Sequence, residues 1–323
     1  MESTEPLVSI VVPIYNEAEV LDELLQRLRG VLEPLGPYEV VLVDDASTDS
    51  SWERLLSHAA DDRRFRLIRL SRNFGHQVAI TAGLDAARGD VVVTMDGDLQ
   101  DPPEVIPSLV AKWREGYDVV YAVRTEREGE TLFKRGTAAA FYWLLARLSP
   151  TDIPAQAGDF RLLSRRAARA LSQMPERARF LRGMSSWIGY RQIGVPYRRD
   201  ARYAGSTKYP ARKMMRFASD AITSFSSAPL RVVSGIGLFF VVFCAGYLAY
   251  SLYAKFATDD TVPGWTTVVV LVLLLGGVQL VGLGIVGTYV ARIFEESKRR
   301  PLYLVDEVFE GGRVETVEEP ELR

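Results

Sequence analysis

Short apolar runs alternate with amphipathic stretches along the first 125 residues of the chain. The apolar runs have the length and the β-branched content of strands and cover Val8–Val12, Glu39–Val43, Arg66–Leu70, Asp90–Met95 and Asp118–Val123. Between them, apolar residues recur at helical spacing, most clearly from Val20 to Leu32. Strands that are apolar throughout and are separated by helices predict a parallel sheet covered on both faces.

The other helices of this region are predicted from similar signals. Ser50 with Glu53 three residues later forms a capping-box pattern, which predicts a helix start. Further helices are expected over His76–Ala87 and near Glu104–Glu115, and His76 is expected only to begin its helix, with no catalytic duty. Ligands bind beyond the carboxyl ends of the strands in such a sheet, so the residues that follow each strand matter most.

Beyond Thr131 the pattern is looser. Helices are expected over roughly 132–148 and 165–173, with a loop between them that carries Gly158-Asp159-Phe160-Arg161. The stretch 211–225 places apolar residues on one side and basic residues nearby, which suits a helix lying on a membrane surface. Packing of that helix against the preceding domain is the alternative.

Two long stretches, Val232–Ala254 and Thr266–Ala291, contain no charged residue. A helix rises about 1.5 Å per residue, so each stretch is long enough to cross a hydrocarbon core about 30 Å thick. Basic residues flank the pair at Arg216, Arg231, Arg292, Lys298, Arg299 and Arg300, whereas the connecting loop has Lys255 against Asp259 and Asp260. The positive-inside rule therefore predicts a multi-pass protein of the inner (plasma) membrane, with both termini in the cytoplasm.

These signals divide the chain into four parts. Residues 1–210 form a cytoplasmic α/β domain, residues 211–229 an amphipathic interfacial helix, residues 230–291 two transmembrane helices with a short external loop, and residues 292–323 a cytoplasmic tail. The N-terminus is polar and acidic and has no signal-peptide pattern.

Composition narrows the chemistry. The lone Cys244 excludes disulfides and cysteine zinc sites, and two histidines are too few for a histidine-rich metal site. Any metal is therefore held by oxygen atoms, which points to Mg²⁺ or Mn²⁺. The net charge is only −2, but the stretch 176–216 is strongly basic, which suits anionic lipid head groups or a phosphorylated ligand. No nucleic-acid partner is expected, because no binding motif accompanies the charge.

Acidic residues follow several predicted strands. Asp44 and Asp45 end the second, and Asp96-Gly97-Asp98 ends the fourth. Carboxylates placed in this way can hold a divalent cation against a diphosphate, and Gly97 is expected to let the backbone turn. The glycine fingerprint of dinucleotide-binding folds and the phosphate-binding P-loop are both missing from the sequence, which disfavours a hydride-transfer enzyme or an ATPase.

Four motifs in order carry a family resemblance: Pro13–Glu17, Val43–Asp49, Ser71–Gly75 and Asp96–Pro102. Together they resemble glycosyltransferase family 2, and more narrowly the polyprenyl-phosphate glycosyltransferases related to dolichol-phosphate mannose synthase. The segment Gly205–Tyr209 and the two apolar stretches are similar to bacterial members that glucosylate undecaprenyl phosphate. The likeness runs from about Val8 to Arg300 and implies a GT-A-type, Rossmann-like, mostly parallel sheet.

The resemblance also implies roles for individual residues. The nucleotide sugar would be bound by Pro13, Tyr15, Glu17, Asp44, Asp45 and Asp96, with Asp44 reading the base. The metal would be held by Asp96, Asp98 and Gln100. The acceptor phosphate would be bound by Arg124, Arg135, Arg202, Ser206 and Lys208, with Lys134 as an alternative to Arg135. Asp159 resembles the family's proposed base, although it could instead orient the acceptor or stabilise the reacting sugar.

The chemistry of the predicted reaction is compatible with these roles. Negative charge develops on the leaving diphosphate, and a metal ion and fixed cations stabilise that charge. A phosphate acceptor has a second pKa of about 6 and is largely a dianion at neutral pH, so a strong base is not required. Single displacement with inversion is implied by the family resemblance.

The predicted function is transfer of one hexose, glucose, from UDP-glucose to undecaprenyl or a similar polyprenyl phosphate. Transfer from GDP-mannose or from a UDP-N-acetylhexosamine stays open, as does a non-catalytic membrane scaffold or flippase partner. Polymer synthesis is disfavoured, because Arg182–Trp187 lacks the Gln-x-x-Arg-Trp motif of processive enzymes. A homo-oligomer, a tetramer by resemblance, is also expected.

Overall fold

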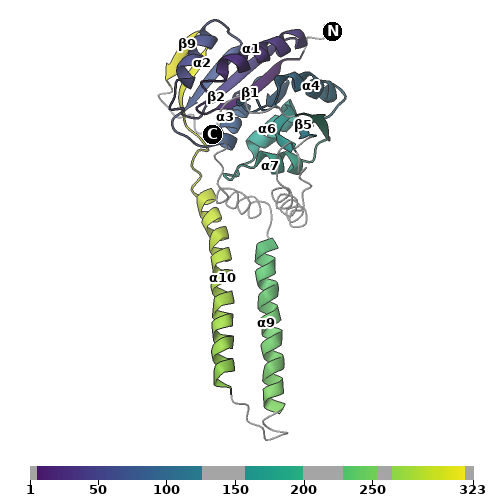
Figure 1. Cartoon of the computed structure of the whole chain (residues 1–323), viewed down its shortest axis with the longest axis vertical. Coiled ribbons are helices and arrows are strands. Elements are labelled where there is room, and N and C mark those ends of the chain that lie inside the picture. Colours follow the sequence, from purple (N-terminus) through teal and green to yellow (C-terminus); the bar gives the residue numbers. More distant parts are fainter. Residues whose placement is uncertain (1–5, 126–156, 199–227, 254–263, 317–323) are drawn as a thin grey trace. The chain divides into compact units, whose positions relative to one another are not determined.

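The computed structural model describes residues 6–125, 157–198, 228–253 and 264–316, and it divides into two units (Figure 1). The first, called the sheet unit here, combines the described residues up to 198 with residues 300–316. The second, called the helix pair, contains 228–253 and 264–299. The predicted helix over 132–148 and most of the predicted interfacial helix lie outside the described residues.

The sheet unit is built on one sheet of nine strands in the order β7-β5-β6-β4-β1-β2-β3-β8-β9. The strands are β1 (Val8–Ile14), β2 (Tyr38–Asp44), β3 (Phe65–Leu70), β4 (Val91–Thr94), β5 (Val119–Arg124), β6 (Ala157–Ser164), β7 (Gln192–Tyr197), β8 (Val305–Glu310) and β9 (Arg313–Thr316). The central strands β4, β1, β2 and β3 run parallel, which confirms the predicted parallel sheet. Antiparallel β6 and β8 flank this centre.

Helices cover both faces of the sheet. They are α1 (Leu21–Leu32), α2 (Ser51–Ala60), α3 (His76–Ala86), α4 (Ile106–Arg114), α6 (Arg165–Gln173) and α7 (Leu181–Trp187), with short 3₁₀ turns η1 (Glu33–Leu35) and η2 (Pro103–Val105). Side chains alternate between the faces along a strand. Ile10 and Val12 therefore meet the core with α1, whereas Val11 lies under α3.

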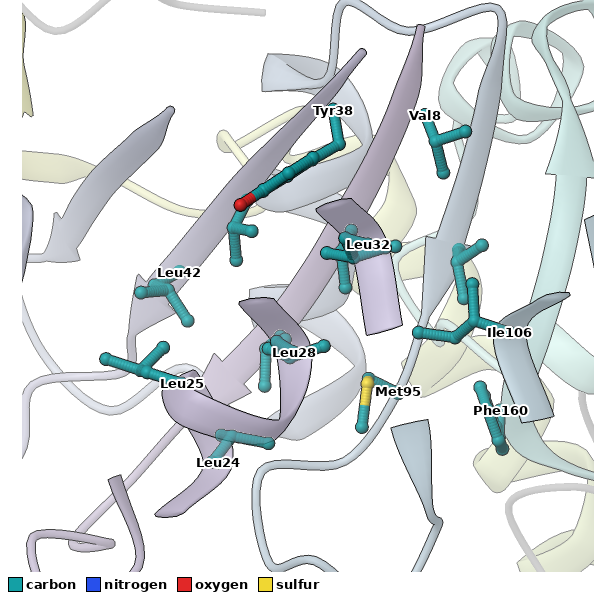
Figure 2. Close-up of a cluster of buried hydrophobic side chains, with 14 of the residues drawn as sticks. Val8, Leu24, Leu25, Leu28, Leu32, Tyr38, Leu42, Met95, Ile106 and Phe160 are labelled. Carbon is teal, nitrogen blue, oxygen red and sulfur yellow. The ribbon is translucent and has the colours of Figure 1, made fainter. Parts of the chain in front are cut away.

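The larger core lies between α1 and the central strands. Leu24, Leu25, Leu28 and Leu32 recur at helical spacing, are fully buried, and point toward the strands (Figure 2). The opposing strand residues include Leu42, which is also fully buried. This packing fixes the strands, and hence the positions of the loops at their carboxyl ends, because close-packed interiors tolerate little movement.

Gly83 allows α3 to approach the sheet closely. A Cβ atom at this position would lie 2.2 Å from Cγ1 of Val11 and 3.2 Å from Cγ2 of Val43, both on buried strands. We expect Gly83→Ala to destabilise the protein by about 1–3 kcal/mol through overpacking. Thermal unfolding compared with Gly30→Ala, where a Cβ meets nothing within 4 Å, would test this expectation. An equal effect of the two substitutions would contradict it.

The segment after helix α10 (Trp265–Ser297) completes the sheet, although the sequence pattern predicted only a tail. Strand β8 pairs antiparallel with β3 and buries Phe309 at 6 % exposure. Trp52 Nε1 donates to Glu307 Oε2 at 3.0 Å, and Ser71 N donates to Leu304 O at 2.9 Å. The residues that follow the helix pair in the sequence are therefore part of the sheet unit.

Two other local predictions were wrong. The expected loop at Gly158–Arg161 is strand β6, which pairs with both β4 and β5. The expected capping box is absent, because the Ser50 side chain makes no capping hydrogen bond. Instead, Asp49 Oδ1 accepts from Ser51 N at 3.0 Å at the start of α2.

The helix pair consists of α9 (Ala228–Tyr253) and α10 (Trp265–Ser297), which lie side by side (Figure 1). In the described part of the chain, one helical stretch, Val270–Ser297, is long and apolar enough to cross a membrane, with a mean hydropathy of 2.4. The apolar part of α9, Val232–Tyr247, is shorter. Two transmembrane helices therefore stay a prediction.

Candidate active site

The loops that follow β1 and β2 are joined by hydrogen bonds. Asn16 Oδ1 accepts from Thr48 N at 2.7 Å and from Asp49 N at 3.3 Å, and Asn16 N donates to Ser47 Oγ at 3.0 Å. Asn16 has a φ of 57°, a left-handed conformation that asparagine tolerates better than most residues. Because of these contacts, the two loops at the carboxyl edge of the sheet form one fixed surface.

The predicted nucleotide-binding residues all lie at this edge. Pro13 is buried at the end of β1, Tyr15 is 46 % exposed, and Glu17 is half-buried, with its N–H donating to Ser51 Oγ at 3.0 Å. The side chain of Tyr15 is therefore accessible to a ligand. Binding of a nucleotide by these residues stays a prediction.

Asp44 and Asp45 hold the surrounding loops in place. Asp44 is fully buried, and both of its carboxylate oxygens accept from Ser47 N. The Asp45 carboxylate accepts from Phe74 N at 2.7 Å and from Gly75 N at 2.9 Å. Burial raises the pKa of both carboxyl groups above the ordinary value, against the effect of these hydrogen bonds. In this structure, Asp45 fixes the loop that leads into α3.

The turn Asp96-Gly97-Asp98 follows β4 and presses against the end of β1. A Cβ atom on Gly97 would lie 2.8 Å from Cδ1 of Ile14 and 3.3 Å from the carbonyl oxygen of Pro13. The left-handed residue of the turn is Leu99, with a φ of 58°. Gly97 thus allows the turn to pack closely against Ile14, and the left-handed conformation of the turn belongs to Leu99 rather than to Gly97.

Asp96 and Asp159 are brought together by the register of β4 and β6. Thr94 is paired with Arg161, so continuing the antiparallel register by two residues places Asp96 opposite Asp159. The residues next to Asp96 and Asp159 in the sequence point into the core with α1. Because side chains alternate between the faces of a sheet, Asp96 and Asp159 point to the opposite face, which α3 covers. Thr94 Oγ1 donates to the carbonyl oxygen of Asp159 at 2.6 Å, which joins the two strand ends. Like charges placed opposite each other repel, so cationic partners are needed nearby.

His76 lies between the two carboxylates. Its Nε2 is 3.1 Å from Asp96 Oδ1 and 3.6 Å from Asp159 Oδ2. Neighbouring atoms displace water from the imidazolium, which lowers its pKa, but the contacts with Asp159 and Asp96 outweigh this effect and raise the pKa of His76 to about 10. His76 does begin α3, as the sequence predicts. It also contacts two predicted site residues, Asp96 and Asp159, which the sequence did not reveal.

Arginines surround Asp159 on its other sides. Arg182 Nε and Nη2 donate to its two oxygens, each at 3.1 Å, and Gln77 Nε2 donates to Oδ2 at 3.0 Å. Arg161 is 3 % exposed and donates to the carbonyl oxygens of Leu181 and Gly158. Burial acts to raise the pKa of Asp159, but Arg182, His76 and Arg161 hold it well below its usual range. Burial lowers the pKa of Arg161 to about 10.

Arg124 is anchored to the loop that carries the predicted metal ligands. Its Nε donates to Tyr197 Oη at 3.2 Å, and Tyr197 in turn donates to the fully buried Asp101. Arg124 Nη2 also lies close to Gly158, since a Cβ atom there would be 3.1 Å away. The structure therefore brings Arg124 near Asp159. The other predicted acceptor ligands, Arg135, Arg202, Ser206 and Lys208, lie outside the described residues.

The Asp96–Gln100 turn fits a divalent cation that is shared with a diphosphate. Asp96 Oδ1 is buried, and although His76 Nε2 lies 3.1 Å away, the two atoms are not aligned as a hydrogen bond, so this oxygen can still bind a ligand. Asp98 Oδ1 accepts from Gln100 N at 3.2 Å, which holds the second carboxylate on the same turn. Across the described ranges, three or more His, Cys, Asp or Glu residues nowhere converge on a metal site. A cation held by one or two carboxylates needs no such cluster when phosphate oxygens complete its shell.

A family model named "Glycosyl transferase family 2" matches residues 9–172. The matched range contains the loops after β1, β2 and β4 and the residues Arg124 and Asp159, but not Tyr197. The chain belongs to glycosyltransferase family 2. A second model, "GtrB C-terminal hairpin", matches residues 228–293. The family membership predicted from the four motifs is thus confirmed.

Individual glycosyltransferases of this kind are similar to the chain over almost their whole length. "Uncharacterized glycosyltransferase YkcC" of Bacillus subtilis is 47 % identical, covering 93 % of this chain and 94 % of that protein. "Bactoprenol glucosyl transferase" of Shigella phage SfV is 41 % identical, covering 92 % and 97 %. A crystal structure of glucosyl-3-phosphoglycerate synthase from Mycobacterium tuberculosis with Mn²⁺, UDP and phosphoglyceric acid has a TM-score of 0.50 and 21 % identity, covering 68 % and 76 %. That structure supports the fold of the sheet unit.

Proposed function

We propose that the protein transfers one glucose from UDP-glucose to a polyprenyl phosphate of the undecaprenyl type at the cytoplasmic face of the membrane. The observation that carries this proposal is the 41 % identity to a bactoprenol glucosyl transferase over 92 % of the chain. The match of the helix pair to the "GtrB C-terminal hairpin" supports a membrane-bound protein. We further propose two spans, with both termini in the cytoplasm, since the flanking charges follow the positive-inside rule.

The order of strands supports a division of the site into a donor side and an acceptor side. The nucleotide-binding candidates follow β1 and β2, the Asp96–Gln100 turn follows β4, Asp159 lies on β6, and Arg124 ends β5. The predicted metal ligands thus lie between the donor residues and the basic residues. This arrangement suits a reaction in which the sugar moves from one phosphate group to another.

Asp96, Asp98 and Gln100 would hold Mg²⁺ or Mn²⁺. When bound, such a cation supplies stabilisation of the negative charge that develops on the departing diphosphate. Asp96 also stays our candidate for contact with the sugar, because its Oδ1 lies 3.1 Å from His76 Nε2, which also contacts Asp159. Arg124, held by Tyr197, would bind the acceptor phosphate, and single displacement would invert the anomeric carbon.

A donor panel separates this proposal from its alternatives. Purified protein is incubated with Mn²⁺, undecaprenyl phosphate and radiolabelled UDP-glucose, GDP-mannose or UDP-N-acetylglucosamine, and chloroform-soluble label is counted. We expect the product with UDP-glucose to exceed the other two by about tenfold or more, because a site with dedicated polar contacts rejects a mismatched donor. A better reaction with GDP-mannose or UDP-N-acetylglucosamine would replace the donor assignment.

Absence of lipid-linked label with every donor would contradict the enzyme assignment and favour the scaffold alternative. Omitting the lipid phosphate is the matched control, because label that persists without it cannot come from transfer to the lipid. The predicted homo-oligomer stays a prediction, which the mass of the detergent-solubilised protein would test.

A further inference from the structure

The Asp159 carboxylate is occupied on both oxygens. Oδ1 accepts from Arg182 Nε, and Oδ2 accepts from Arg182 Nη2 and Gln77 Nε2, all at 3.0–3.1 Å. His76 Nε2 lies a further 3.6 Å from Oδ2. The side chain of Asp159 is only 8 % exposed. To take a proton from a ligand, this carboxylate would have to give up hydrogen bonds to charged partners, which are the strong ones.

The start of α7 is built to hold Arg182 against this carboxylate. Gln77 Oε1 accepts from Leu181 N at 3.1 Å, so the same glutamine binds both Asp159 and the residue before Arg182. Arg161, on β6, also holds the start of α7, since its Nη1 donates to the carbonyl oxygen of Leu181 at 3.2 Å. The Arg182 side chain is 26 % exposed, three times as much as that of Asp159. The carboxylate is thus nearly buried, whereas part of the Arg182 side chain is accessible to a ligand.

Arg182 also shares its surroundings with other cations. Arg124 lies on β5, the strand next to β6. The charge of Arg182 acts to lower the pKa of Arg124 and of the buried Arg161. Arg124 Nη2 would lie 3.1 Å from a Cβ atom on Gly158, whose carbonyl oxygen accepts from Arg161 Nη2 at 2.7 Å, and the next residue, Asp159, binds Arg182. Guanidinium groups gathered in this way favour the binding of an anion. In the order of the strands, this group lies beyond the Asp96–Gln100 turn, on the side away from the nucleotide candidates.

We propose that Asp159 is a positioning residue that holds Arg182 toward the acceptor phosphate, and that this phosphate attacks without a protein base. The proposal rests on the proposed function. In the step itself, a phosphate oxygen forms a bond to the anomeric carbon while the bond from that carbon to the donor diphosphate breaks. The electron pair leaves with the nucleoside diphosphate. A phosphate dianion has no proton to lose, so no proton moves and the charge balances.

The charged groups around Asp159 support this role. Arg182 approaches from α7, His76 from α3, Asp96 from β4, and Arg161 lies on β6 itself. A carboxylate whose two oxygens are already held by Arg182 and Gln77 is poorly placed to accept a proton from a ligand.

The first test uses the unmodified full-length protein in detergent. The pH dependence of kcat/KM is measured with a short-chain polyprenyl phosphate and with the matching phosphonate, whose second pKa is higher. We expect the acidic limb of the profile to move to higher pH with the phosphonate, by the difference between the second pKa values of the two acceptors. An acidic limb at the same pH for both acceptors would overturn the proposal, since it would then belong to a group of the protein.

The second test is a double-mutant cycle with Asp159→Asn and Arg182→Gln. We expect each substitution to lower kcat/KM about 10- to 100-fold, mainly through the acceptor KM, and the double variant to be no worse than either alone. The acidic limb should persist in Asp159→Asn. Loss of that limb, or effects that multiply in the double variant, would contradict a positioning role.

Asp118→Asn is the matched control, because Asp118 is also buried and also forms a two-point pair with an arginine, Arg166. It lies just before β5, at the opposite end of that strand from Arg124, and we expect the substitution to leave the acceptor KM and the pH profile unchanged. A wild-type protein that transfers no sugar to lipid would refute the proposed function. An active wild type whose acidic limb lies at the same pH with both acceptors would refute only the role given to Asp159.

Discussion

Replacing Asp98 with alanine is expected to lower kcat for sugar transfer about 10²- to 10³-fold, the effect of removing a group that stabilises charge in the transition state. Asp98 lies on the turn after β4, where its Oδ1 accepts from Gln100 N. Its loss would leave the cation with fewer protein ligands and weaken the stabilisation of the departing diphosphate. Chloroform-extractable product at saturating UDP-glucose and Mn²⁺ measures the effect.

Glu104→Gln provides the matched control for Asp98→Ala. Glu104 is a carboxylate a few residues along the same loop, but it is 53 % exposed and forms a surface pair with Arg27. We expect little change in kcat and a stability change of at most about 1 kcal/mol. If Asp98→Ala kept more than half of the wild-type kcat, the assignment of Asp98 as a metal ligand would be wrong.

Ending the chain after Pro301 is expected to cost the sheet unit about 5 kcal/mol or more, which is close to the whole stability of many domains. This deletion removes β8 and with it Phe309, whose burial alone is worth about 3–5 kcal/mol. It also removes the hydrogen bond from Trp52 to Glu307 and exposes the edge of β3. Thermal unfolding followed by tryptophan fluorescence should show a much lower or absent transition.

A shorter deletion distinguishes loss of β8 from loss of length alone. Ending the chain after Glu310 removes β9, whose four residues are all exposed, and keeps Phe309 and Glu307. We expect that variant to unfold within a few degrees of the full chain, because exposed positions contribute little. Equal destabilisation by the two deletions would show that β8 is not what stabilises the unit.

The core of the fold could be predicted because its strands are apolar on both faces. Val8–Val12 and Glu39–Val43 have few polar residues, so the sequence predicts strands that are buried on both faces, and the structure buries them. Strand β6 was read as a loop because Asp159 and Arg161 place polar groups on one face. Both groups are buried, so the apolar signal is interrupted in a strand that nevertheless lies inside the sheet, at the candidate active site.

The site was predicted in its parts but not in its connections. The carboxylates of Asp96 and Asp98 could be proposed as site residues from the motif they form after a buried strand, and that role stays a prediction. The contact of His76 with Asp96 and Asp159 could not, because it depends on the register between β4 and β6. Since β6 itself was not recognised, no sequence spacing could reveal that register. Strand β8 was missed for a related reason, because its Glu307 and Glu310 resemble a solvated acidic tail.

The position of β8 in the chain sets the order of events during synthesis. Its residues leave the ribosome only after both apolar helices have been made, so the first two hundred residues emerge without the strand that covers the edge of β3. Domains otherwise begin to fold as they emerge. Nascent chains of this protein therefore carry an unfinished sheet until α9 and α10 have been synthesised, and the sheet unit can be completed only after that point.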